Sequence, residues 1–150
     1  MTSIAEVLSF FRRVTSLRFD ARSEAATGWD GVGSGTVAVS EPMDGVIIFK
    51  ESGTWHPNDM SRVGVSFKNA FRWTAVGDML RLEHLRFGSE HPVLLFDMAH
   101  QGDGRWREVS PHQCRDDCYT ASLILDGGRL LLEWSIIGPR KREYIRYTYW

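Results

Sequence analysis

The chain has 150 residues, of which 43% are hydrophobic and 25% charged, with a formal net charge of −1 at pH 7. This length predicts a single domain over residues 1–150. The near-neutral net charge argues against binding to nucleic acids or anionic membranes. The basic residues are also dispersed: their densest group is Arg140, Lys141 and Arg142, which is too short to form a binding stripe.

The N-terminal residues do not resemble an export signal. Thr2–Val14 has no basic start and no small-residue cleavage pattern, and the chain has no run of about 18 apolar residues that would span a membrane. We therefore expect a cytoplasmic protein, in which Cys114 and Cys118 stay reduced. On one extended strand their Cα atoms would lie about 13 Å apart, too far for a disulfide, so a bridge would require the chain to turn between them.

One helix is predicted, over residues 3–14. Ser3 and Glu6 match a capping box, in which each side chain bonds to a free backbone N–H of the first turn. The apolar residues that follow have helical spacing: Ile4, Val7, Leu8 and Phe11. A helix this short is not stable alone, so its apolar face is expected to dock across one end of a sheet or barrel.

The rest of the chain reads as short strands separated by turns. In residues 65–74 the apolar side chains alternate with polar ones, and Asn69 shares the apolar face. Turns are predicted at glycine-rich or proline-containing segments: Gly28–Gly35, Pro42–Gly45, Gly77–Asp78, Gly102–Gly104, Asp126–Gly128 and Gly138–Pro139. Within Met79–Phe87 the apolar residues change face, which predicts a β-bulge near Glu83–His84.

About nine or ten short strands with one leading helix predict an all-β fold. The connections look short and sequential, and the last strand continues to Trp150, as a strand that closes a sheet would. We therefore expect an antiparallel up-and-down β-barrel, wide enough to hold one small ligand.

Four segments resemble an uncharacterised bacterial and fungal family, the domain of unknown function numbered 6314. His112–Tyr119 is similar to its H-x-C-x-x-D-x-Y motif, and Trp134–Lys141 to its W-x-V-x-G-P-x-K segment. Phe71–Trp73 and Phe49–Gly53 resemble its Y-x-W and aromatic-x-E-x-G strands.

The resemblance spans about residues 8–149, with two departures. Arg142 and Glu143 stand where the family usually has Asp-Tyr, and the family's Asp-Gly turn is replaced around Ser89–His91. The resemblance implies a calycin-like barrel, similar to lipocalins and fatty-acid-binding proteins. It implies no activity.

A polar cluster is predicted where the last strands begin and end. Asp117 shares the more apolar face of its strand, where a bare carboxylate would be costly, so it needs a partner. His112, Arg140 and Lys141 are the available partners. Two interpretations are open. In the first, the cluster has a function and orients a ligand or acts in acid–base chemistry; in the second, it is a structural ion pair at one mouth of the barrel.

Four aromatic residues are predicted to line a pocket: Phe71, Trp73, Tyr119 and Trp134. The alternative is that these residues are plain core. If Trp134 is buried, its indole N–H needs an acceptor, which would mark polar space inside the barrel.

No metal or cofactor site is predicted. His112, Cys114 and Cys118 would spread along roughly 20 Å of strand, unlike the compact ligand pairs of structural zinc. Gly31–Gly35 is glycine-rich, but no helix follows it to present its N-terminus to a phosphate.

The leading functional hypothesis is a barrel that binds a small apolar molecule. Because Arg140 and Lys141 form a cationic pair beside the aromatic pocket, the ligand could also carry an acidic group. Two alternatives stay open: an enzyme that uses Asp117 or His112 as acid or base, and a scaffold without a pocket that acts through a sheet face or the helix. The sequence leaves the oligomeric state open.

Overall fold

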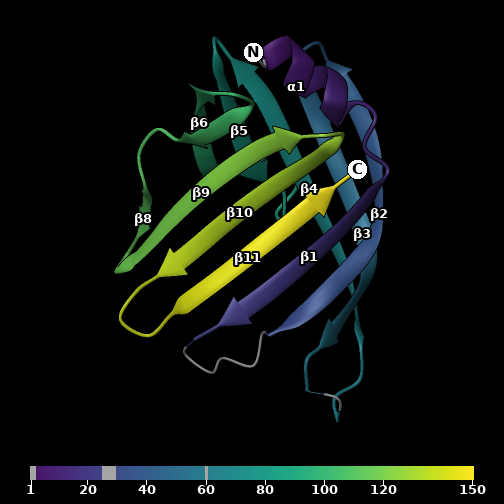
Figure 1. Cartoon of the computed structure of the whole chain (residues 1–150), viewed down its shortest axis with the longest axis vertical. Coiled ribbons are helices and arrows are strands. Elements are labelled where there is room, and N and C mark those ends of the chain that lie inside the picture. The colour runs from purple at the N-terminus through teal and green to yellow at the C-terminus, as the bar shows by residue number, and fades with distance from the viewer. Residues whose placement is uncertain (1–2, 25–29, 60) are drawn as a thin grey trace.

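The computed structural model describes residues 3–24, 30–59 and 61–150, except for the side chains of His112 and Cys114. One helix and eleven strands lie in this part of the chain (Figure 1). In chain order they are α1 (Ile4–Phe11), β1 (Ser16–Ser23), β2 (Gly31–Met43), β3 (Val46–Pro57), β4 (Val65–Val76), β5 (Met79–His84), β6 (Val93–Gly102), β7 (Arg105–Glu108), β8 (His112–Cys114), β9 (Asp117–Asp126), β10 (Arg129–Ile137) and β11 (Arg142–Tyr149).

Ten of the strands close into one antiparallel barrel. Each strand from β1 to β7 pairs with the next, β7 pairs with β9, and β9, β10 and β11 follow in order. The pairing of β11 with β1, from Leu17 opposite Tyr149 to Ser23 opposite Glu143, closes the circle. The three-residue strand β8 adds to β9 outside the circle. The predicted all-β, antiparallel up-and-down barrel is confirmed.

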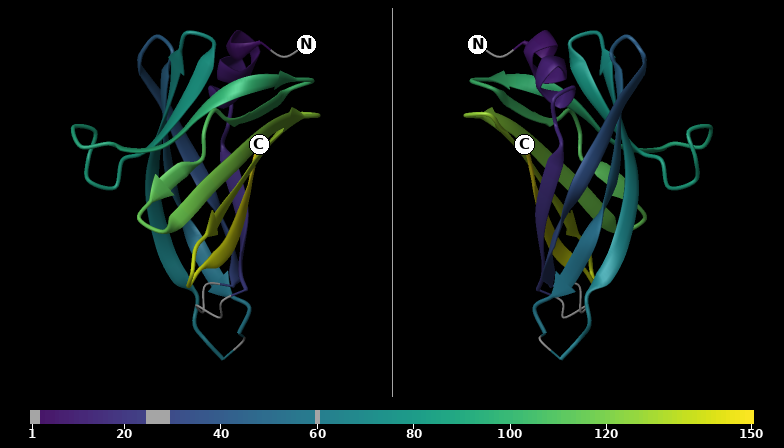
Figure 2. Two further views of the ribbon diagram at one scale, coloured as in Figure 1. Left: turned by 90° about the vertical axis from the view of Figure 1, so that its left-hand side faces the viewer. Right: turned by 90° about the vertical axis from the view of Figure 1, so that its right-hand side faces the viewer.

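The N-terminal helix is real but shorter than predicted. Its N-cap is Ser3, whose hydroxyl accepts a hydrogen bond from the Glu6 N–H at 3.3 Å, and it ends at Phe11 because Arg12 is already the C-cap. Figures 1 and 2 show α1 lying across one end of the barrel. The Phe11 ring is fully buried, 4.7 Å from the Trp73 ring and 5.6 Å from the Phe49 ring. The expected docking of the helix is therefore confirmed, and we call this end of the barrel the helix end.

The two ends of the barrel have different connections, because the strands alternate in direction. Two-residue turns join the strands at the helix end, at residues 44–45, 77–78, 103–104 and 127–128. Gly45, Gly77 and Gly127 have φ of 79°, 62° and 56° there, which glycine adopts without strain. The opposite end carries the longer connection between β3 and β4, at the bottom of both views in Figure 2, and we call it the loop end; residues 85–92, between β5 and β6, project from the side of the barrel.

The helix-end half of the interior is filled by side chains. The inward residues of this half are almost completely buried: Leu17, Val37, Ile47, Phe49, Trp73, Leu80, Leu82, Met98, Leu123, Leu130 and Leu132. Together with Val7 and Phe11 of α1 they form one continuous core. Such close packing leaves the open space of the interior toward the loop end.

The turn predicted at Gly28–Gly35 is wrong for Gly31–Gly35, which lies in β2; Gly28 and residue 29 are outside the described part of the chain. The inward glycines of β2 leave room for aromatic rings. A Cβ added to Gly33 would overlap the Phe19 ring, and one added to Gly31 would overlap Trp55. The glycines therefore serve packing across the strand rather than a change of direction.

The predicted bulge is confirmed in position, with one difference. The β5–β6 register shifts between Leu82 and Glu83, which face Phe96 and Leu94, so the extra residue is Leu95 on the partner strand. β5 also ends at His84 instead of continuing to Phe87.

Among the described residues, no helix has the length and apolar character needed to cross a bilayer.

Candidate functional site

A cavity of about 310 Å³ opens at the loop end of the barrel. Its walls come from β1, β3, β4 and β11, which are neighbours around the barrel but far apart in the sequence. The lining residues are Phe19, Ala21, Arg22, Trp55, Val65, Phe67, Glu143 and Ile145. All except Arg22 are in the inward phase of their strands, so the cavity is the mouth of the barrel interior.

Aromatic rings form the floor and one wall of this cavity. The Phe19 ring lies 5.2 Å from the Phe67 ring and 5.2 Å from the Tyr147 ring. Because Gly33 has no side chain, Phe19 lies against the barrel wall instead of projecting across the lumen. The space in front of these rings is therefore apolar and open to the loop end.

Charged groups stand at the edge of the cavity. The Arg62 guanidinium lies 5.9 Å from the centre of the Trp55 ring, at cation–π distance. Arg22 and Glu143 belong to the lining itself. Asp59 lies close enough to Arg62 for the guanidinium to help lower its pKa, after the larger effect of the hydrogen bonds that the carboxylate accepts. The rim thus carries charges of both signs beside an apolar wall.

Deeper in the barrel, Glu51 is a buried carboxylic acid. It is 2% exposed, and the Tyr149 hydroxyl donates a 2.6 Å hydrogen bond to its Oε2. Its Oε1 has no hydrogen-bond partner among the described residues. Burial raises the pKa of Glu51 to about 7, and the side chains of Tyr149 and Asn69, which favour the ionised form, offset only part of this rise.

A continuous aromatic stack connects the cavity floor with Glu51. Phe19 touches Tyr147, and the Tyr147 and Tyr149 rings are stacked, with centroids 5.6 Å apart and planes within 5° of parallel. Burial also raises the pKa of both tyrosines, with the Glu51 charge adding to the effect. Both phenols therefore stay protonated, and Tyr149 can act as a donor to Glu51 over the whole physiological range.

The predicted polar cluster lies at the loop end but does not line the cavity. The Lys141 Nζ is 3.9 Å from the Asp117 Oδ2, and the Asp117 carboxyl occupies the space where Gly138 would carry a Cβ. Arg140 is exposed in the β10–β11 connection. The backbone of His112 pairs with Tyr119, but its side chain is outside the described part of the structure. Asp117 and Lys141 thus come together, and a ligand-binding role for the cluster stays a prediction.

The predicted aromatic residues are separated into two groups. Phe71 and Trp134 meet with their ring centres 6.2 Å apart in the middle of the barrel, and the half-buried Tyr119 packs against the same core. Trp73 lies instead at the helix end, beside Phe11. The buried Trp134 Nε1 has no acceptor among the described residues, which leaves a polar atom inside the barrel. No contact of these four residues tests their predicted role in binding.

Arg72, which lies between two of the predicted aromatic residues in the sequence, and Arg86 have partners of their own. Arg72 binds Glu83 through a 2.9 Å ion pair, and the Arg86 guanidinium lies 5.0 Å from the Phe87 ring centre. Both contacts account for these side chains without a ligand.

The chain does turn between the two cysteines. Cys114 faces Asp117 in the β8–β9 register, and Cys118 carries a free, half-buried thiol; the Cys114 side chain is outside the described part. Over the side chains that the structure describes, no three His, Cys, Asp or Glu residues come close enough to hold a metal ion.

Sequence reasoning missed the cavity lining and Glu51. A signal for Glu51 was present in the Phe49-x-Glu51-x-Gly53 pattern, because period-2 alternation puts Glu51 on the same face as the inward Phe49. The lining residues gave no comparable signal, since Phe19, Trp55 and Phe67 come from three separate segments.

Comparison with known proteins gives one match. A family model described as "Family of unknown function (DUF6314)" matches residues 12–150 of the chain. The chain matches no curated protein and no solved structure.

Proposed function

The chain belongs to this family of unknown function, DUF6314, and we propose that it binds one small, mainly apolar molecule with an acidic group in the cavity at the loop end. The observation that carries the proposal is the cavity itself: about 310 Å³ of space in the barrel mouth, walled by inward-facing apolar side chains. A volume of this size is at the lower end of the range for small-molecule sites.

The apolar wall supplies the driving force. Phe19, Trp55, Phe67 and Ile145 remain partly in contact with water at the cavity surface. A ligand that covers them removes this apolar area from water, at about 25 cal/mol per Å². The rings are held by the glycines of β2 and by each other, so little side-chain ordering is needed on binding.

The charges at the rim favour an acidic ligand. Arg22 has no carboxylate within 4.0 Å among the described residues, and Arg62 stands beside Trp55. In the lining itself Arg22 and Glu143 balance in charge. The positive charge that favours an acidic group is therefore that of Arg62 beside Trp55, which also helps to lower the pKa of the nearby Asp59. An acidic head group at the rim would pair with these guanidinium groups while its apolar part enters the barrel.

We also infer that the barrel is of the calycin kind, to which lipocalins and fatty-acid-binding proteins belong. Ten sequential antiparallel strands closed into a barrel, with a helix across one end and an apolar mouth at the other, support this assignment. Barrels of about this size are wide enough to hold one small ligand.

Native mass spectrometry of the untagged protein tests the proposal, first as purified and then with added decanoate as the probe. We expect a mass excess that is lost on denaturation. Ala21→Leu places a larger side chain in the cavity and is expected to abolish decanoate binding. Ala38→Leu makes the same change on the outer, exposed face of β2 and is the matched control.

Two results would contradict the proposal. One is a bare mass for the wild-type protein both as purified and with decanoate. The other is decanoate binding that Ala21→Leu and Ala38→Leu leave equally strong, because the occupied site would then lie elsewhere.

A further inference from the structure

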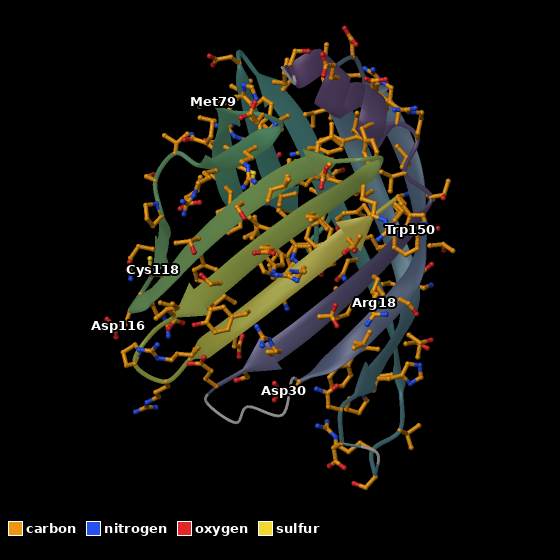
Figure 3. The ribbon with its side chains drawn as sticks, in the orientation of Figure 1. Arg18, Asp30, Met79, Asp116, Cys118 and Trp150 are labelled. Atoms are coloured by element: carbon orange, nitrogen blue, oxygen red, sulfur yellow. The ribbon has the colours of Figure 1, made fainter. Side chains whose placement is uncertain are left out.

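A second hollow lies on the outer surface of the barrel and shares only Arg22 and Ile145 with the lining of the barrel mouth. It has a volume of about 640 Å³ and follows strands β7, β9, β10, β11 and β1. Strands β9, β10, β11 and β1 of this face are turned toward the viewer in Figure 3. Its outward-facing lining is Asp20, Arg22, Arg107, Thr120, Ser122, Glu133, Ser135, Tyr144 and Arg146.

The strand register arranges most of these residues in one straight row. Arg107 is opposite Ser122, and Ser122 is opposite Glu133. Glu133 is in turn opposite Arg146, and Arg146 is opposite Asp20. Side chains that are directly opposite in antiparallel strands have Cβ atoms about 5 Å apart, so the row is a continuous line of polar groups across five strands.

A second row runs beside the first. Thr120, Ser135, Tyr144 and Arg22 are opposite one another on β9, β10, β11 and β1. The hydroxyls of Thr120 and Ser135 are hydrogen-bonded to each other at 2.5 Å. The two rows together form a patch in which every outward side chain is polar.

The sizes of the side chains explain the hollow. The floor, on β9 and β10, carries the short side chains of Thr120, Ser122 and Ser135. Arg107 borders it on β7, and Tyr144 and Arg146 border it on β11. The result is a trough with a hydroxyl floor between long polar walls.

The charges in this trough have both signs. Glu133 pairs with Arg146 at 2.7 Å, and Asp20 pairs with Arg18 at 3.5 Å. A strongly anionic ligand would meet the two carboxylates, and a cationic one would meet the arginines. A neutral molecule with many hydroxyl groups meets neither penalty, because each hydroxyl can donate to a carboxylate and accept from a guanidinium.

We propose that this trough, defined by the two polar rows, binds a neutral carbohydrate. The hydroxyls of Ser122 and Ser135 and the charged groups of Glu133 and Arg107 match the paired donors and acceptors of a sugar ring. The half-buried Tyr144 ring offers an apolar edge for the C–H face of the sugar. Apart from Arg22 and Ile145, which line both, the trough and the barrel mouth are built from different residues, and the proposal does not rest on a ligand in the mouth.

The experiment applies the whole protein to an array of neutral and of acidic oligosaccharides and then measures the affinity of each retained glycan by calorimetry. We expect neutral glycans to be retained. Ser122→Tyr fills the floor and is expected to abolish binding, whereas Ser66→Tyr, at an exposed position of β4, should not change it. Arg107→Ala should weaken binding about tenfold, because it removes a charged donor.

Arg105→Ala is the matched control for Arg107→Ala, since Arg105 is exposed on the same strand but outside the lining. Ala21→Leu, which fills the barrel mouth, should leave glycan binding unchanged and so separates the two sites. The proposal is overturned if the array retains no neutral glycan, or if Ser122→Tyr binds as well as the wild-type protein does. It is also overturned if Ser66→Tyr loses as much affinity as Ser122→Tyr.

Discussion

The helix end and the loop end of the barrel are built from the same ten strands but have different interiors. The inward positions of β2 show the difference within one strand: Val37 and Val39 at the helix end, and Gly31, Gly33 and Gly35 toward the loop end. The valines join the packed core, while the glycines leave room for the rings of Phe19 and Trp55 to lie against the wall. The alternation of inward and outward side chains is thus the same in both halves of the barrel. The size of the inward side chains decides which half is hollow.

The connections follow the same division. Two-residue turns and α1 close the helix end, whereas the cavity opens at the loop end, where a longer connection joins two of its walls, β3 and β4. Packing at one end can therefore supply most of the stability, while the other end keeps the exposed apolar surface that the proposed ligand would cover. Four predictions test this division, beginning with the largest expected effect.

Loss of an aromatic ring should cost much more at the helix end than at the loop end. Phe11→Ala removes a fully buried ring between Phe49 and Trp73, and we expect the free energy of unfolding to fall by about 3–5 kcal/mol. Phe67→Ala removes a half-buried ring that borders open space and should cost about 1–2 kcal/mol. Urea unfolding followed by circular dichroism measures both, and equal losses would refute the division.

Glu51 should make the stability of the protein depend on pH. Its pKa is about 7 in the folded protein and 4.5 as the ordinary value, so the folded state binds the proton more tightly than the unfolded state does. This contribution is fully present below pH 4.5 and is lost as the pH rises through 7, a difference of about 3 kcal/mol.

Glu51→Gln isolates this effect, because glutamine does not titrate but still accepts the Tyr149 hydrogen bond. As the pH rises from 4.5 to 8, we expect the free energy of unfolding of the variant to increase by up to about 3 kcal/mol relative to that of the wild-type protein. Urea unfolding at a series of pH values measures the difference. Glu133→Gln, in an exposed ion pair, is the control, and parallel curves for Glu51→Gln and the wild type would count against a buried acid.

A methyl group on Gly33 should close part of the cavity. In Gly33→Ala the new Cβ meets the Phe19 ring, which must move toward the lumen, and we expect a loss of about 1–3 kcal/mol in the free energy of unfolding. Decanoate binding should weaken at the same time. Ser34→Ala, at the neighbouring exposed position, should change neither quantity, and a Gly33→Ala protein with full stability and binding would show that the glycine is not needed.

The smallest effect on stability is expected at the rim. Arg62→Ala changes an exposed side chain, so the free energy of unfolding should stay within about 0.5 kcal/mol of the wild-type value. Decanoate affinity should fall about threefold to tenfold, whereas affinity for uncharged decanol should not change. Calorimetry with both probes, and with Lys68→Ala as an exposed control, decides whether the charge at the mouth selects acids.

Local sequence features predicted much of the fold. The Asp126–Gly128 segment predicted a hairpin, and β9 and β10 are joined there. The change of apolar face in Met79–Phe87 located the bulge, but not that its extra residue is Leu95 on the partner strand, because a register shift belongs to two strands at once. Gly31–Gly35 was wrongly predicted to be a turn for a similar reason: the rings that occupy the space beside Gly31 and Gly33 belong to Trp55 and Phe19, which lie on other strands.

The sequence by itself determined the strands, the leading helix, the closed antiparallel barrel and the family, because alternation, capping and turn residues act over a few neighbouring positions. Only the tertiary structure decided where the interior is hollow and which acid is buried. Glu51 and Tyr149 are 98 positions apart in the chain, and the cavity is shared by β1, β3, β4 and β11. Such sites depend on how the closed sheet brings distant inward faces together, and that relation is set by strand register and side-chain volume around the whole barrel.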